Sequence, residues 1–420
     1  MEQKESSKIN LLITAYACSP SQGSEAGVAW WWITNCAKSY DVTVITCEAQ
    51  RLDIEKAVAS ENINIKFKFI KWPKSISPSG VEHRFERFKV YFWEILAIYY
   101  VRQLTNSIKF DLSQHISIAT WRLPSCLAFT NVPFILGPVS GSEILPKGFS
   151  RHLSFRGFIW SNVRNFLIHL SWYDPFIRYT LLRAKRILVS SPQTYEQLKK
   201  SYNGKVEYYG HAFKSLDILK IKPNMEKEFY VKNVIKLVWM GNLIPRKGLE
   251  LVIRALKDKR LHSCILDIMG EGPEKKRCLR IAKELGVENR INFLGRLPRK
   301  EAINKLIEYD VFVFSSLQDM MGQALSEAMQ MGLPCVVMDW GGPSALVGDT
   351  GAVKVPISSF KDTCQNLADK LVEVCFNPKR LKELSYNAIQ RINYLSDQEL
   401  LNKKRDKIFA SILHEHNLQE

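Results

Sequence analysis

Two acidic residues stand eight positions apart in the stretch SSLQDMMGQALSEAMQMGLPCVV, residues 315–337. Asp319 is expected in a loop, and Glu327 in a short helix that ends before Gly332-Leu333-Pro334. Eight helical positions separate two Cα atoms by roughly 12 Å, whereas carboxylates that act together on a glycosidic bond lie about 5 to 9.5 Å apart. The spacing therefore disfavours an acid–base pair. It favours two anchors for one extended ligand with hydroxyl groups at both ends.

Two adjacent cations, Arg246 and Lys247, lie in the stretch GNLIPRKG, residues 241–248. This stretch follows the apolar run VIKLVWM and leads into a predicted helix, so the cations lie at the carboxyl end of a strand. Ligands of open α/β sheets bind at that edge, and helix N-termini attract anions. Charged pairs are also common on solvated surfaces, but this position predicts a phosphate site. The amides of Gly322-Gln323-Ala324, at another predicted helix start, are expected to face the same negative charge.

Several further segments are weaker candidates. Gly23 and Ser24 lie between the first predicted strand and helix, where glycine allows a close backbone approach and free amides favour a phosphate. His115 lies at a strand end before the loop that holds Arg122. A lone histidine is more often structural, and any βα turn can contain glycine, so position alone keeps these functional hypotheses open.

Two stretches offer narrow backbone against which a flat base could lie. They are the turn that begins at Gly270, GEGP, and the strand end FLGRLP, residues 293–298. Either stretch is equally compatible with a plain turn.

Alternating short apolar runs and helix-length segments must position these residues. Residues 9–17 and 42–47 flank one such segment, and the pattern returns after residue 234 with apolar runs that begin near 264, 291, 311 and 334. Tandem βα units predict parallel, doubly wound sheets. We therefore expect an α/β protein with two Rossmann-like domains, residues 1–212 and 213–395, facing each other across a cleft. A helical tail, 396–420, could pack on either domain.

Bulk composition narrows the class of protein. The 420 residues exceed what one core usually fills, and the formal net charge of +17 favours anionic partners such as phosphates, acidic lipid headgroups or nucleic acid. No nucleic-acid-binding module is recognisable. The nine cysteines form no C-x-x-C pair, and the N-terminus MEQKESSKIN lacks the order of a signal peptide. We expect a cytoplasmic protein without a structural metal.

Two segments, 83–104 and 149–186, combine aromatic residues with arginine. One interpretation is a surface that binds anionic lipid at the inner face of a membrane. The other is that each segment is a helix whose aromatic residues contribute to a core. The sequence leaves both open.

The order and spacing of the motifs ACSPSQGSEAG, HISIATWRLPS, PFILGPVSGSE, MGNLIPRKG, MGEGP and FLGRLP, together with the 315–337 stretch, resemble family-4 glycosyltransferases of the GT-B fold. The resemblance implies that Glu327 binds the ribose of a nucleotide-sugar donor and that Asp319 binds the transferred sugar. It also implies that Gly322 and Gln323 offer amides to the sugar and diphosphate. Lys247 matches a diphosphate-binding lysine that Arg246 assists.

The same resemblance places Gly23 and Ser24 in a loop facing the donor, Gly270 and Arg296 near the base, and His115 close to a cleft histidine. It implies retaining transfer to a glycan or lipid-linked glycan in bacterial polysaccharide biosynthesis. It implies no cofactor besides the donor substrate, and no D-x-D motif stands at a strand end to bind a metal.

Three positions depart from the family pattern: Asp319 stands where Glu is usual, Asn242 where Arg is usual, and His115 is offset by about one residue. The departures at Asn242 and Asp319 could mark a degenerate, non-catalytic scaffold subunit. A nucleotide-sugar 2-epimerase, which shares the architecture, is a second alternative.

Overall fold

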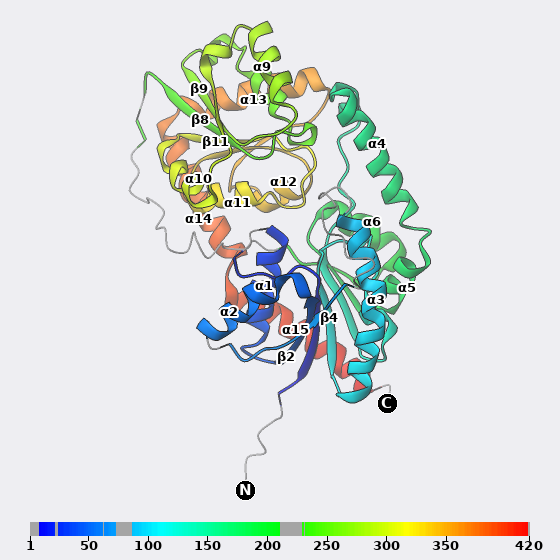
Figure 1. Cartoon of the computed structure of the whole chain (residues 1–420). Helices are drawn as coiled ribbons and strands as arrows, with labels where there is room; N and C mark the ends of the chain where they lie inside the picture. The colour runs from blue at the N-terminus through cyan, green and yellow to red at the C-terminus, as the bar shows by residue number, and fades with distance from the viewer. Residues whose placement is uncertain are drawn as a thin grey trace.

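The computed structural model describes residues 8–21, 24–61, 63–72, 86–210, 229–230 and 232–418. They form two α/β domains stacked on each other (Figure 1). The expected linker around residue 212 lies almost wholly outside the described residues, as does the boundary itself.

The N-terminal domain contains a seven-stranded parallel sheet in the order β3-β2-β1-β4-β5-β6-β7. Its strands are β1 (Asn10–Ala15), β2 (Asp41–Cys47), β3 (Lys66–Ile70), β4 (Leu112–Ser117), β5 (Phe134–Val139), β6 (Arg186–Val189) and β7 (Val206–Tyr208). Its helices are α1 (Ser24–Cys36), α2 (Arg51–Glu61), α3 (Glu86–Ser107), α4 (Phe155–Leu170), α5 (Pro175–Arg183) and α6 (Pro192–Tyr202).

The C-terminal domain contains a six-stranded parallel sheet in the order β10-β9-β8-β11-β12-β13. Its strands are β8 (Ile235–Met240), β9 (Cys264–Met269), β10 (Ile291–Gly295), β11 (Val311–Phe314), β12 (Cys335–Met338) and β13 (Val353–Val355). Its helices are α8 (Leu249–Ala255), α9 (Lys275–Glu284), α10 (Arg299–Lys305), α11 (Gln323–Gln330), α12 (Gly341–Val347), α13 (Phe360–Cys375) and α14 (Pro378–Leu395). The expected class, two Rossmann-like domains, is confirmed.

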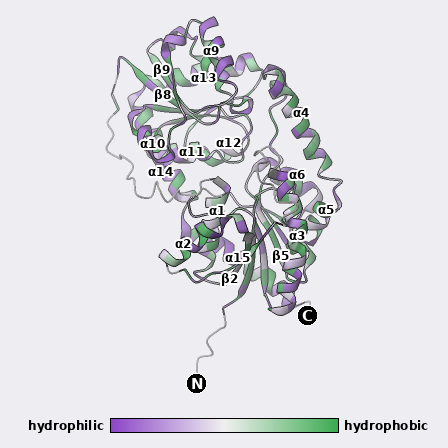
Figure 2. Cartoon of the chain, in the orientation of Figure 1, coloured by the Kyte–Doolittle hydropathy of each residue, from purple (hydrophilic) through white to green (hydrophobic). Residues whose placement is uncertain are grey.

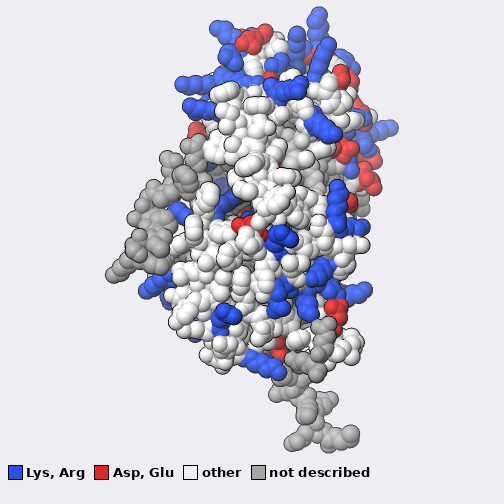
Figure 3. Space-filling model, turned by 90° about the vertical axis from the view of Figure 1, so that its right-hand side faces the viewer, with Lys and Arg blue, Asp and Glu red and all other residues white. Residues whose placement is uncertain are grey.

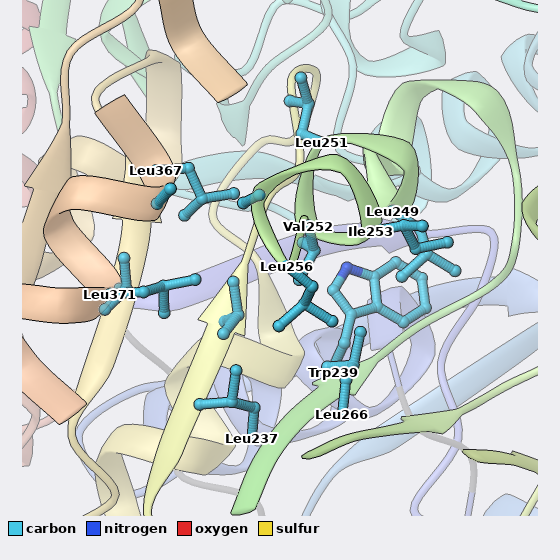
Figure 4. Packing of buried hydrophobic residues seen from close by; sticks show 14 of the residues in the cluster. Leu237, Trp239, Leu249, Leu251, Val252, Ile253, Leu256, Leu266, Leu367 and Leu371 are labelled. Carbon is cyan, nitrogen blue, oxygen red and sulfur yellow. The ribbon is translucent and has the colours of Figure 1, made fainter. Parts of the chain in front are cut away.

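Hydrophobic alternation explains how the C-terminal sheet acquires its helix layer. Leu237 and Trp239 lie two residues apart on β8, so their side chains point to one face. Figure 4 shows them with Leu266 of β9 beneath the leucines of α8 and the α13 residues Leu367 and Leu371. Figure 2 shows the same division, with mainly hydrophobic strands inside and a largely hydrophilic α9 outside.

Two segments tie the domains together. Phe149, from the connection between β5 and α4, is buried in the C-terminal core with its ring centroid 5.8 Å from that of Phe360. In the other direction, α15 (Gln398–Asn417) returns to the N-terminal domain, where Tyr40 donates a hydrogen bond to Asp406 at 2.6 Å. Ile408 and Phe409 of α15 pack in the same core as β1 and β2. The helical tail therefore packs on the N-terminal domain rather than standing apart.

Candidate functional site

The chain order of each sheet reverses at one place, and ligands of open α/β sheets bind beside such a switch point, outside the carboxyl ends of the strands. In the C-terminal domain the reversal lies between β8 and β11. The loop after β8 carries Arg246 and Lys247, and the loop after β11 carries Asp319. The topology alone therefore brings these predicted site residues to one edge.

Hydrogen bonds to the backbone hold the loop after β8 against the loop after β11. The Leu317 amide donates to the carbonyl of Arg246 at 2.9 Å, and the Ser315 hydroxyl donates to the carbonyl of Lys247 at 3.0 Å. Gly248 has φ +65°, and a Cβ there would lie 2.3 Å from the Ser315 carbonyl oxygen. Glycine is thus required both by the left-handed backbone and by the close approach.

This arrangement pairs Lys247 with Asp319. The Lys247 ammonium forms a hydrogen-bonded ion pair with Oδ2 of Asp319, and Arg246 Nη1 lies 3.7 Å from Oδ1. Burial lowers the pKa of Lys247, the Asp319 carboxylate opposes that shift, and Arg246 adds to it. Arg246 also donates to the carbonyl of Gln318 at 2.6 Å. Two partly buried cations are therefore held at a fixed place, as a site for a phosphate requires.

Glu327 has a different cation. Arg299, the first residue of α10, donates through Nη2 to Oε1 of Glu327 at 2.6 Å and through Nε at 3.2 Å. The Glu327 side chain is 9% exposed. The two carboxylates of the 315–337 stretch thus belong to separate ion pairs, which fits the prediction of two anchors rather than one acid–base pair.

The start of α11 lies between these anchors. Gly322 precedes the helix with φ +80°, and a Cβ there would lie 2.7 Å from the Phe314 ring. Gln323 is the first residue of the helix, so its backbone N–H belongs to the unpaired first turn. These amide N–H groups can donate hydrogen bonds to a negatively charged ligand group.

The two weaker base-binding candidates have structural contacts. Arg296 donates to the side chain of Asn242 at 3.3 Å. A Cβ at Gly270 would lie 1.8 Å from the carbonyl oxygen of Gly241, so this glycine allows the turns after β8 and β9 to pack together. Arg296 stays close to the site, whereas Gly270 has a sufficient structural explanation.

His115 is buried inside the N-terminal domain. It sits in β4 with 1% of its surface exposed, and its Nδ1 is 3.3 Å from the Thr14 hydroxyl and 3.6 Å from Glu94 Oε1. Burial lowers the pKa of His115 to about 4 and raises that of Glu94 to about 7. Every residue of β4 is buried. The role of His115 as a cleft histidine stays a prediction.

The two candidates in the loop after β1, Gly23 and Ser24, can be placed only in part. Gly23 is outside the described residues. Ser24 begins α1, but its side chain is not described.

The N-terminal domain meets this edge through residues 143 and 144. Gln318 donates to the carbonyl of Glu143 at 2.7 Å, and the Trp340 indole donates to the carbonyl of Ile144 at 2.9 Å. Glu143 itself is buried and accepts hydrogen bonds from Ser191 at 2.7 Å and Thr194 at 3.1 Å. Charged atoms of both signs are visible in the recess at mid-height in Figure 3.

Sequence reasoning missed Arg299 and Glu143. Arg299 had a usable signal, because a cation in the first turn of a helix opposes the helix dipole unless a carboxylate compensates it. Glu143 had none, since its partners Ser191, Thr194 and Arg164 are distant in the sequence.

Two further observations concern the whole described part of the chain. It contains no group of three or more His, Cys, Asp or Glu side chains arranged to hold a metal ion. None of its helices is long and apolar enough to span a membrane.

Parts of the chain are similar in sequence to known glycosyltransferases. Residues 221–391, which include Lys247, Asp319 and Glu327, match the family described as Glycosyl transferases group 1. The chain is 32% identical over 108 residues to the lipopolysaccharide core biosynthesis glycosyltransferase LpsD of Rhizobium meliloti, covering 26% of this chain and 30% of LpsD.

A second curated relative is the GDP-mannose-dependent alpha-(1-6)-phosphatidylinositol monomannoside mannosyltransferase of Mycolicibacterium smegmatis. It is 31% identical over 128 residues, which is 28% of this chain and 34% of the relative. The chain spans less than half of the length of the first curated relatives that it matches.

Solved structures extend the likeness to the whole chain. HepE from Anabaena, determined in complex with UDP, superposes with a TM-score of 0.60 over 96% of this chain and 100% of HepE, at 16% identity. A glycosyltransferase from Rickettsia africae superposes with a TM-score of 0.62 over 97% of this chain and 99% of its own, also at 16% identity. The fold is GT-B. At this level of identity the superpositions speak for the fold alone.

Proposed function

We propose that the protein is a glycosyltransferase that moves a sugar from a nucleotide-sugar donor to a glycan or lipid-linked glycan acceptor in bacterial polysaccharide biosynthesis. The observation that carries the proposal is the pairing of Lys247 with Asp319 beside the exposed start of α11, at the switch point of the group 1 domain. Fixed cations and free amides there can stabilise a departing nucleoside diphosphate, and preorganised charge of this kind is usually the largest catalytic contribution.

The proposal assigns each residue a role that is compatible with its contacts. Lys247 and Arg246 bind the diphosphate and stabilise the charge that develops on it, while Asp319 orients the Lys247 ammonium and accepts hydrogen bonds from sugar hydroxyls. Glu327, oriented by Arg299, binds the ribose hydroxyls. Arg296 lies beside Asn242, where it supplies positive charge at the position that lacks the family's usual arginine.

The proposal includes transfer with retention of anomeric configuration and without a metal ion. Support comes from the resemblance of the motifs and from a sequence without a D-x-D motif. In this scheme the cations of the chain itself neutralise the leaving diphosphate.

The acceptor side of the proposal rests on α4. This 16-residue helix, about 24 Å long, turns only Gly157, Ser161 and Ile168 fully inward. Its exposed apolar side chains include Phe155, Ile159, Trp160, Val163, Phe166 and Leu170. Figure 3 looks onto the side that bears α4 and shows a broad uncharged area with Lys and Arg on its flanks. An apolar helix face flanked by cations suits an anionic membrane surface, where lipid-linked acceptors reside.

A thermal-shift panel of nucleoside diphosphates and their sugars, with and without EDTA, tests the donor site. A ligand at about 100 times its dissociation constant stabilises the fold by about 2.7 kcal/mol. One base should stand out, with a shift that EDTA leaves unchanged. A panel without any shift would contradict the proposal, and a shift that EDTA abolishes would contradict metal independence.

Cosedimentation tests the membrane surface separately. The protein should sediment with phosphatidylglycerol-containing vesicles and remain in the supernatant with pure phosphatidylcholine. Replacing Phe155 and Phe166 by Ser should weaken sedimentation. Leu52→Ser is the matched control, because Leu52 of α2 is 75% exposed, close to the 78% of Phe155. Equal sedimentation of all three proteins would remove α4 from the membrane contact.

A further inference from the structure

Three arginines of the N-terminal domain gather where it meets the C-terminal site. Arg122 follows β4, which lies at the switch point of the N-terminal sheet, while Arg87 stands in the first turn of α3 and Arg164 on α4. Arg164 belongs to the inward-facing stripe of α4, four residues before the buried Ile168. Its guanidinium lies 3.5 Å from Glu143 Oε2, beside the carbonyl that Gln318 of the other domain contacts.

Arg122 is the buried member of this arginine cluster. It is 7% exposed, and its Nε and Nη2 atoms have no hydrogen-bond partner within the described part of the chain. Gly141 makes room for it, since a Cβ there would lie 3.2 Å from Arg122 Nε. A buried guanidinium with unsatisfied N–H groups is costly to maintain, so its retention here requires an explanation.

Neighbouring carboxylates do not supply that explanation. Glu143 already accepts hydrogen bonds from Ser191, Thr194 and the Gly141 amide, and its contact with Arg164 is long. Burial lowers the pKa of Arg122 to about 9 and that of Arg164 to about 10, and Arg87 lowers both further. Arg87 keeps access to solvent, yet the surrounding protein lowers its pKa as well, with partial compensation from Glu25 and Glu143. Arg87 thus lies close enough to Arg122 and Arg164 to lower the pKa of each, and Glu143 opposes this effect at both arginines.

We propose that Arg87, Arg122 and Arg164 form a subsite that binds an anionic group of the acceptor, a phosphate or a carboxylate. This inference rests on the proposed transferase function and adds the chemical class of the acceptor. Guanidinium groups bind such oxyanions through paired N–H donors. The donor diphosphate has its own cations, Arg246 and Lys247, on the opposite domain.

The position of Arg164 links this subsite to the apolar face of α4. The same helix turns Arg164 inward and Phe166 outward. A lipid-linked acceptor could therefore rest its apolar part on the outside of α4 while its phosphate reaches the arginine cluster. An acidic sugar of a growing glycan would satisfy the same cluster without using that face.

The test measures binding of three probes to the full chain saturated with the nucleoside diphosphate that the thermal-shift panel selects. The probes are inorganic pyrophosphate, farnesyl diphosphate and glucuronate. Their binding is measured by calorimetry. Arg164→Gln and Arg87→Gln remove partly accessible members and are expected to fold. Arg156→Gln is the matched control, because Arg156 is an exposed arginine on the same helix.

We expect Arg164→Gln and Arg87→Gln each to weaken the binding of at least one probe by about tenfold or more, with a smaller change in nucleotide affinity. Arg156→Gln should change neither affinity. If the binding of farnesyl diphosphate depends on Arg164, the anionic group is a lipid phosphate. If the binding of glucuronate depends on it, the group is an acidic sugar of a glycan. Unchanged binding of all probes overturns the inference, as does an equal loss of nucleotide affinity, which would assign the cluster to the donor. Nucleotide binding is measured in the same preparations, so failure of the donor site is recognised separately.

Discussion

The two sides of the domain junction hold their charges differently. On the C-terminal side both site carboxylates are paired with cations: Asp319 with Lys247 and, at 3.7 Å, with Arg246, and Glu327 with Arg299. On the N-terminal side, Arg122 is buried with N–H groups that have no partner among the described residues, and Glu143 is largely occupied by hydroxyl groups.

This difference has a physical meaning. Ion-paired cations are positioned before a ligand arrives, so little reorganisation is needed during the reaction. Cations in excess over carboxylates gain most of their stabilisation when an anion binds. The C-terminal side is therefore suited to catalysis on a ligand common to every turnover, and the N-terminal side to selection of an acidic partner.

The largest expected effect tests the paired side. Lys247→Ala should lower turnover by about 10² to 10³, the range seen when one donor to a transition-state charge is removed. Release of nucleoside diphosphate from the donor measures it. Lys257→Ala, an exposed lysine of the same domain, is the control and should keep full activity. Normal turnover in a folded Lys247→Ala protein would remove this lysine from the site.

A second prediction concerns the buried pair of Glu94 and His115 in the N-terminal domain. Because the folded-state pKa of Glu94 is raised to about 7, its contribution to stability is complete below its ordinary value and is lost as the pH rises through 7. His115, with its pKa lowered to about 4, has the opposite slope: its contribution is present above its ordinary value and is lost as the pH falls through 4.

Glu94→Gln should remove only the first of these slopes. We expect the stability of wild type relative to the variant to fall by about 2 kcal/mol between about pH 5 and pH 7. Thermal unfolding midpoints of both proteins across this range measure the difference. A difference that stays constant with pH would show that Glu94 is ionised normally in the fold.

The third prediction tests whether Glu327 is a ligand anchor. Glu327→Gln should weaken nucleotide binding by about tenfold or more, since hydrogen bonds to charged groups are worth about 1.5 to 3 kcal/mol. Calorimetric titration with the selected nucleoside diphosphate measures the loss. Glu301→Gln, an exposed glutamate of α10, is the control. Arg299→Gln should cause a smaller loss of affinity, because Arg299 orients the carboxylate without contacting the ribose. A larger loss in Arg299→Gln than in Glu327→Gln would assign the ligand contact to Arg299.

The sequence predicts some of these features and not others. The strands and helices of the C-terminal domain could be predicted because buried parallel strands are short, strongly apolar runs between helix-length segments. Lys247 and Asp319 were both identified as site residues, but their pairing across 72 positions depends on how two loops pack. β4 shows the opposite case. Its sequence, LSQHIS, looks half polar, yet all six residues are buried because partners distant in the sequence satisfy them: Gln114, for example, donates to the carbonyl of Gly137 at 2.8 Å.

The smallest expected effect tests the loop contact that places Lys247 next to Asp319. Gly248 and Gly286 have nearly equal backbone angles, φ +65° and +66°, but a Cβ at 248 would strike the Ser315 carbonyl, whereas nothing lies within 4 Å of one at 286. Both alanine variants share the cost of a left-handed backbone, so their difference isolates the contact. Gly248→Ala should be less stable than Gly286→Ala by about 1 kcal/mol or more, measured by thermal unfolding, and it alone should also lower donor turnover. Equal stability with normal turnover in both would mean that the loop can move away from β11 without disturbing the Lys247–Asp319 pair.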